Sequence, residues 1–160
     1  DAGLRVLDKI QILDSIDCTG QIMAPDDAPP YDNDKRFRLM MELDANPDAA
    51  QKLFEEYPKD ILNRRYFLNC IWVYDTALLN NCTMTEMIDT MNKYPICRCN
   101  EMTIMNLLLH FKYKLWKPFP VNASNKKILF DWCELNSVEP VTWRDYCLIK
   151  YPVTIQFDDC

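Results

Sequence analysis

The eight cysteines of this chain are its most unusual source of chemistry. Thiols can ligate zinc, act as nucleophiles or form disulfides. Three of them, Cys70, Cys133 and Cys147, lie among large apolar residues and are interpreted as small core residues. The other five fall in expected loops or at the end of the chain, as in secreted proteins whose helix ends are linked by disulfides. We therefore predict disulfides at Cys18, Cys82, Cys97, Cys99 and Cys160.

Metal binding and catalysis find little support in the remaining residue types. Zinc could be held by Cys82, Cys97, Cys99 and His110, but one residue between two thiols differs from the usual C-x2-C spacing, so we predict no metal site. His110 is the only histidine and lies in the most apolar segment, which favours a hydrogen-bonded structural role over that of a catalytic base. No serine occupies a G-x-S-x-G turn, and there is no Gly-rich phosphate loop. We expect no catalytic residues, no cofactor and no enzymatic activity.

Two kinds of surface site remain as hypotheses. Asn81 and Asn122 each begin an N-glycosylation sequon in an expected loop, although about one sequon is expected by chance in this composition. A patch of lysines interleaved with aromatic residues could bind phosphates and stack bases. The structural alternative is that its lysines complement a helix dipole while the indole packs on the core, and we favour that alternative. The candidate patch comprises Lys112, Lys114, Trp116, Lys117, Lys126 and Lys127.

Composition predicts the fold that would position these residues. At 160 residues and 49% hydrophobic, the chain can bury the core of one ordinary domain without disulfides or metal. Only two glycines occur, which disfavours the tight turns of β-rich folds. We therefore predict an all-α protein, with residues 1–160 forming a single compact helical domain of about seven or eight helices. At most a short strand is expected, in the alternating tail at 153–157.

Hydrophobic periodicity locates the first of these helices. Residues 4–16 are predicted to form an amphipathic helix, followed by a Pro- and Asp-rich loop at 20–33 and a short helix at 34–44. Asn46 is expected to cap a helix that starts at Pro47 and ends at Pro58. Residues 60–80 are ambiguous, because their aromatic centre suits a buried strand, but a length of about 20 residues without Gly or Pro favours a buried helix.

The second half of the chain is likewise predicted to be helical. Thr83 and Glu86 have the spacing of a capping box, which opens a helix that ends before Pro95. Asn100 could cap the following helix, which runs to 115 and is apolar almost all round, as a central helix would be. Helices are also expected at 125–136, after Ser124, and from Thr142 to 149.

These observations favour binding over catalysis. The net charge of -6 disfavours non-specific nucleic-acid binding by the whole protein, and neither a membrane span nor an uncleaved signal peptide is expected. Our leading hypothesis is a non-enzymatic, disulfide-containing protein, secreted or lumenal, that binds a protein partner. The alternative is a cytoplasmic adaptor or scaffold subunit with free thiols. Nucleic-acid binding through the patch at 112–127, or carriage of a small apolar ligand, would be further alternatives.

Overall fold

A computed structural model describes residues 4–6, 10–25, 41–96, 100–120, 130–132 and 148–150. The chain divides into two compact units. One, here called the terminal unit, comprises residues 1–17 and 118–160; the other, the central unit, comprises residues 18–117. The interpretation of the chain as a single domain stays a prediction.

The terminal unit contains a three-stranded mixed sheet. Its strands are β1 (Leu4–Val6), β6 (Leu148–Lys150) and β5 (Phe130–Trp132), in the order β1-β6-β5. β1 pairs antiparallel with β6, with Arg5 opposite Ile149, whereas β5 runs parallel to β6. A short 3-10 helix, η1 (Ile10–Ser15), belongs to the same unit. The sheet thus joins an N-terminal strand to two strands from the last 31 residues of the chain.

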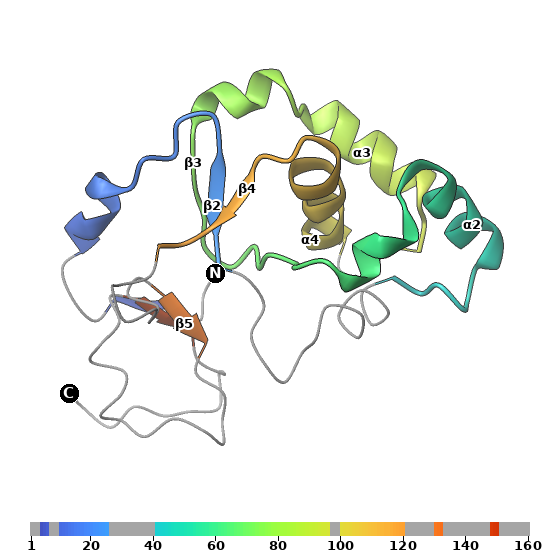
Figure 1. The fold of residues 1–160 in the computed structure, drawn as a ribbon, viewed down its shortest axis with the longest axis horizontal. Coiled ribbons are helices and arrows are strands. Elements are labelled where there is room, and N and C mark those ends of the chain that lie inside the picture. The colour runs from blue at the N-terminus through green and yellow to red at the C-terminus, as the bar shows by residue number, and fades with distance from the viewer. Residues whose placement is uncertain are drawn as a thin grey trace. The chain divides into compact units, whose positions relative to one another are not determined.

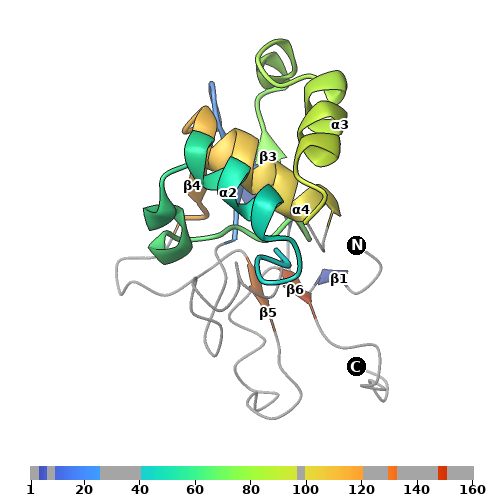
Figure 2. The ribbon, with the colours of Figure 1, turned by 90° about the vertical axis from the view of Figure 1, so that its right-hand side faces the viewer.

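The central unit combines a small sheet with three α-helices (Figure 1). β2 (Ile22–Ala24) lies between β3 (Val73–Tyr74) and β4 (Trp116–Pro118), and it pairs antiparallel with β3. The helices are α2 (Pro47–Glu56), α3 (Met84–Lys93) and α4 (Asn100–Met105), which Figure 2 shows from a second side. Two 3-10 helices, η2 (Lys59–Asn63) and η3 (Thr76–Asn80), connect them.

α4 continues directly into a π-helical segment, η4 (Asn106–Lys112), at the centre of the core. Asn106 is fully buried at this junction. Its side-chain nitrogen donates to the carbonyls of Phe67 (2.9 Å) and Met102 (3.0 Å), and its side-chain oxygen accepts from the Phe67 N–H (2.9 Å). The amide therefore binds both backbone groups of Phe67, which an apolar side chain could not do. Tyr66, beside it, shares a buried hydroxyl contact of 3.0 Å with Thr103.

The all-α prediction is wrong. Within the described ranges, the chain forms three α-helices, several 3-10 or π segments and two three-stranded sheets. The helix predicted at 4–16 contains a strand and a 3-10 helix, and the loop predicted at 20–33 contains β2. The helices predicted at 125–136 and 142–149 contain strand residues of β5 and β6. The spacing of apolar residues carries no information about pairing with distant strands. It is this pairing that stabilises these segments in extended form.

The helix predicted at 60–80 is also wrong, because this stretch forms η2, β3 and η3 with extended chain between them. The reason lies in contacts with distant residues. Leu68 N–H donates to the carbonyl of Pro25 (2.8 Å), and Phe67 uses both its backbone groups on Asn106. These bonds replace the ones that a helix would have formed within the segment. Trp72, which lies within the segment predicted to be a buried helix, is 42% exposed.

Three of the predicted helices are confirmed. Asn46 caps α2 by accepting from Ala49 N–H, and Thr83 caps α3 by accepting from Glu86 N–H (3.2 Å). The apolar segment after Asn100 is helical as far as Lys112, short of the predicted end at 115. Of the helix predicted at 34–44, Met41 forms a bridge and residues 43–45 form a turn, while residues 34–40 lie outside the described residues. The same holds for the tail at 153–157.

Candidate functional site

The central unit has a groove whose lining is almost entirely apolar, with a volume of about 540 Å³. This volume lies in the usual range for ligand-binding clefts in proteins. Its walls come from β3, η3, α3 and α4, and its floor includes residues of β2 and η4. The lining consists of Ile22, Asn69, Trp72, Tyr74, Leu78, Leu79, Cys82, Met84, Met87, Ile88, Met91, Glu101, Ile104, Met105 and Leu109.

α3 supplies one wall through four apolar side chains at helical spacing. Met84, Met87, Ile88 and Met91 are separated by three, one and three residues, so they share one face of the helix. In a monomeric domain such a face is normally buried. Here Met84 is 70% exposed, Ile88 46% and Met91 37%. The apolar face of α3 therefore lines the groove and stays largely exposed to solvent.

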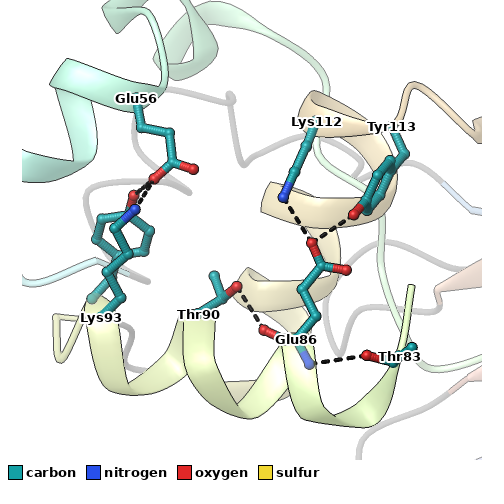
Figure 3. Close-up of polar contacts among 8 residues, drawn as sticks. Glu56, Thr83, Glu86, Thr90, Lys93, Lys112 and Tyr113 are labelled. Carbon is teal, nitrogen blue, oxygen red and sulfur yellow. Dashed lines mark hydrogen bonds and ion pairs between the residues drawn. The ribbon is translucent and has the colours of Figure 1, made fainter. Parts of the chain in front are cut away.

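The polar face of α3 is fixed by hydrogen bonds to other elements (Figure 3). The Glu86 carboxylate accepts from Lys112 Nζ at 2.7 Å and from the Tyr113 hydroxyl at 2.6 Å. Partial burial acts to raise the pKa of Glu86, but these two bonds and the lysine charge hold it below its usual value. Glu86 thus links α3 to the C-terminal end of η4. This link orients α3 so that the helix's apolar face is turned toward the groove.

The C-terminal end of α3 is fixed in the same way. Lys93 and the hydroxyl of Tyr94 both donate to the carboxylate of Glu56, the last residue of α2 (Figure 3). The hydrogen bond from Lys93, with that from Tyr94, lowers the pKa of Glu56. Tyr94 is buried and its ring contacts Tyr57 edge-on. Both ends of α3 are therefore braced on the side that faces away from the groove.

The opposite wall is an aromatic and aliphatic surface that follows β2 and β3. Trp72 and Tyr74 stack with their ring centroids 5.1 Å apart, and Leu79 is 59% exposed. Asp75 fixes the start of η3 by accepting from Ala77 N–H (2.9 Å) and from Gly20 N–H (2.7 Å). These bonds, first that from Gly20, lower the pKa of Asp75. Gly20 makes its bond with φ of +67°, a conformation that glycine adopts at low cost.

Polar groups are scarce in the groove. Asn69 and Glu101 are the only amide and carboxylate among the lining residues, and Asn69 Nδ2 lies 3.4 Å from the Glu101 carboxylate. Glu101 is exposed, so it can meet a bound molecule without losing a buried partner. The groove can therefore hold an apolar surface and one or a few cationic or donor groups.

The structure places two of the predicted disulfide residues. Cys18 is half-buried and Cys82, in the floor of the groove, is 3% exposed; neither is joined to another cysteine among the described residues. Burial raises the pKa of the Cys82 thiol to about 11, so it is protonated at neutral pH and a poor nucleophile. Cys97, Cys99 and Cys160 lie outside the described residues. The disulfide prediction therefore stays a prediction.

The other predicted site residues do not converge with the groove. Asn81 is exposed at the C-terminal end of η3, and Asn122 lies outside the described residues, so glycosylation at both stays a prediction. In the lysine and aromatic patch, Lys112 binds Glu86 while Lys114 and Lys117 are exposed. Trp116, the aromatic residue of the patch, is 9% exposed, and its indole N–H donates to the carbonyl of Ala24 at 3.1 Å. Lys126 and Lys127 lie outside the described residues.

His110 is half-buried and hydrogen-bonded to the backbone of another segment. Its Nε2 lies 2.7 Å from the carbonyl oxygen of Arg65, to which it donates in the neutral ring. The ring also contacts Phe111 and meets Trp116 edge-on. Burial lowers the pKa of His110, which favours the neutral ring. In the described ranges, no three His, Cys, Asp or Glu side chains come together as a metal site would require.

Sequence reasoning did not identify the groove, although part of its signal was present. The four apolar residues of α3 could be read from their spacing once the helix start at Thr83 was recognised. Their exposure could not, because an amphipathic helix normally buries this face. The opposite wall was assigned to a buried helix at 60–80, which hid Trp72 and Tyr74.

Comparison with known proteins found no matching family model, no similar curated protein and no similar solved structure. No helix among the described residues is both long and apolar enough to cross a membrane.

Proposed function

We propose that this protein is a non-enzymatic binding module that holds the apolar surface of a protein partner in the groove. The observation that carries the proposal is the location of its exposed apolar side chains. Of the seven large hydrophobic residues exposed among the described residues, all except Val6 line this groove. Scattered exposed apolar residues are ordinary, but a contiguous group is typical of interaction sites.

The composition of the walls fits a protein ligand. Exposed aromatic residues and methionines are enriched where proteins bind one another, since they bury a large area and methionine adapts its shape. Trp72, Tyr74, Met84 and Met91 supply such side chains from two walls. Because α3 is braced on its other face by Glu86 and Lys93, the site is formed before a partner arrives, which lowers the ordering cost of binding.

The test compares two substitutions on α3 that add the same charge. Ile88→Asp places a carboxylate in the groove, whereas Thr85→Asp places one on an exposed position that does not line it. With each protein as bait in extracts of its natural source, a partner held by the groove should be retained by the wild type and by Thr85→Asp. Ile88→Asp should retain at least about tenfold less of it, since a buried unpaired carboxylate opposes binding. Equal capture by all three proteins would contradict the proposal.

A small apolar ligand is the second candidate, favoured by the volume of about 540 Å³. Organic extraction of the purified protein followed by mass spectrometry would reveal it. A stoichiometric apolar molecule in the wild type that is absent from Ile88→Asp would support a carrier instead of a protein-binding module.

We also propose a secreted or lumenal location, with an intracellular adaptor as the alternative. The cysteine count supports the proposal. Intact mass after alkylation in denaturant, with and without reduction, distinguishes the two. Protein from its natural source should take up reagent at few sulfurs before reduction and at all eight afterwards. Eight alkylated sulfurs without reduction would instead support the adaptor.

A further inference from the structure

The groove favours a bound molecule that satisfies its own backbone hydrogen bonds. Among its lining side chains, only Asn69 and Glu101 offer an amide or a carboxylate. An extended peptide lying across the other lining side chains would leave buried N–H and C=O groups without partners, at about 1 to 3 kcal/mol each. A helix pairs these groups internally. The side chains of the walls therefore favour a helix over an extended segment, which could pair only with the two-residue edge strand β3.

The dimensions of the α3 wall fit the same ligand. From Met84 to Met91 its apolar face extends over eight residues, whose seven steps span about 10 Å at the helical rise of 1.5 Å per residue. This is two helical turns, the length over which a partner helix presents apolar residues at positions i, i+3, i+4 and i+7. Ile104 and Met105 of α4, with Leu109 of η4, form a nearly closed floor beneath, each at most 5% exposed. A partner helix would therefore pack mainly against the α3 wall and the exposed side chains of the opposite wall.

The charge around the groove is of one sign. The segment 66–92 contains β3, η3 and most of α3, and it has no Lys, Arg or His; neither has the segment 100–109. Together they carry Asp75, Glu86, Asp89 and Glu101. Of these four, Glu101 lines the groove itself and Glu86 is paired with Lys112, whereas Asp89 follows Ile88 on another face of α3.

Charge complementarity therefore distinguishes between apolar ligands. A fatty acid or an anionic lipid would bring a negative headgroup close to Glu101, with no lysine, arginine or histidine among the lining residues to pair with it. An amphipathic helix with lysine or arginine beside its apolar face would bring cations there instead. We propose that the groove binds a basic amphipathic helix of a partner protein, an inference that rests on the proposed binding function.

The experiment uses two synthetic helical peptides of about 18 residues with the same leucine face. One carries lysines on its polar face and the other carries glutamates. Binding of each labelled peptide to the full chain is followed by fluorescence anisotropy at two salt concentrations. The lysine peptide should bind at least about tenfold more tightly at low salt, and the difference should shrink as salt screens the charges. Glu101→Gln should reduce the difference between the peptides.

Ile88→Asp separates binding in the groove from general attraction to an acidic protein. It adds a negative charge, so a lysine peptide held by charge alone would bind it more tightly. A peptide seated in the groove should bind it at least about tenfold more weakly, with Thr85→Asp as the charge-matched control. Circular dichroism and thermal unfolding of both variants check that the fold is kept.

The outcomes separate this inference from the function on which it rests. If both peptides bind equally and both are weakened by Ile88→Asp, the preference for a basic helix is wrong while the groove remains a binding site. If neither peptide binds, the helix proposal is wrong, and the capture experiment decides the proposed function separately. If palmitate displaces the lysine peptide and itself binds more tightly, the ligand is a lipid and this inference is overturned.

Discussion

α2 and α3 are two helices of ten residues each, yet they use their apolar faces differently. Each has a side-chain N-cap, and each carries its apolar residues on one face. In α2 this face is buried, with Leu53 fully inaccessible and Ala49 and Ala50 nearly so. In α3 only Thr90 is buried, while Met84, Ile88 and Met91 are exposed. The difference teaches that amphipathicity specifies a helix with two faces, and the surroundings decide whether the apolar face is buried in the core or left exposed.

The largest expected difference between the helices lies in their apolar residues. Leu53→Ala removes a fully buried side chain and should lower the free energy of unfolding by about 2 to 5 kcal/mol. Ile88→Ala removes a side chain that is 46% exposed and should cost less than about 1 kcal/mol. Urea denaturation of both variants measures this. Similar costs would mean that the α3 face belongs to the core and is not a binding surface.

The caps should cost the same in both helices, despite the difference in burial. Asn46→Ala and Thr83→Ala each remove one acceptor for a backbone N–H in the first turn. Each should destabilise by about 1 kcal/mol, as cap removal does in other helices. The matched serine variants, which keep an oxygen acceptor, should recover most of this loss. A cost near zero for Thr83→Ala would show that α3 depends only on the hydrogen bonds that Glu86, Lys93 and Tyr94 make to other elements.

Acid should weaken α3 before it affects α2. Glu86 belongs to α3; partial burial acts to raise its pKa, but bonds from Lys112 and Tyr113 hold it below the usual value in the folded state. The bonds from Lys93 and Tyr94 likewise lower the pKa of Glu56, but they join α3 to α2 and so affect both helices. A carboxyl group with a lowered pKa stabilises the fold at pH values above its unfolded pKa of about 4.3. That contribution is lost as the pH falls through the lower folded value.

We therefore expect amide exchange in α3 to rise relative to α2, once corrected for the intrinsic rate, when the pH is lowered below about 4.3. Glu86→Gln should remove part of this pH dependence and leave α2 unchanged. If amide exchange responds identically to acid in the two helices, the hydrogen bonds of Glu86 do not govern the stability of α3.

The smallest expected effect concerns a thiol beside α3 and leaves stability unchanged. With its pKa raised to about 11 by burial, Cys82 should react with iodoacetamide at pH 8 about 100-fold more slowly in the folded than in the unfolded protein. Peptide mapping by mass spectrometry measures both rates, with the half-buried Cys18 as an internal comparison. Equal rates would show that the groove floor is open. No reaction in denaturant without reductant would show that Cys82 is in a disulfide, as the sequence predicted.

The sequence by itself determined the features that depend on neighbouring residues. Asn46 with Pro47, and Thr83 with Glu86, specified where α2 and α3 begin, because a cap binds a backbone N–H only three residues away. The apolar segment after Asn100 was identified as central for a similar reason, since its apolar residues occupy every face of one helix. The scarcity of cations around the future groove was also present in the sequence.

Only the tertiary structure decided the rest. The segment 60–80 has the length and composition of a buried helix, but Asn106 and Pro25, which bind the backbone of Phe67 and Leu68, lie about 40 residues away on either side. The strands of both sheets are two or three residues long, too short for a period of two to be recognised. Their pairing joins residues 4–6 to 148–150 and residues 22–24 to 73–74. Exposure of Trp72 and the α3 face follows from these long-range pairings, because burial depends on which distant segments cover a residue and not on the residue's own neighbours.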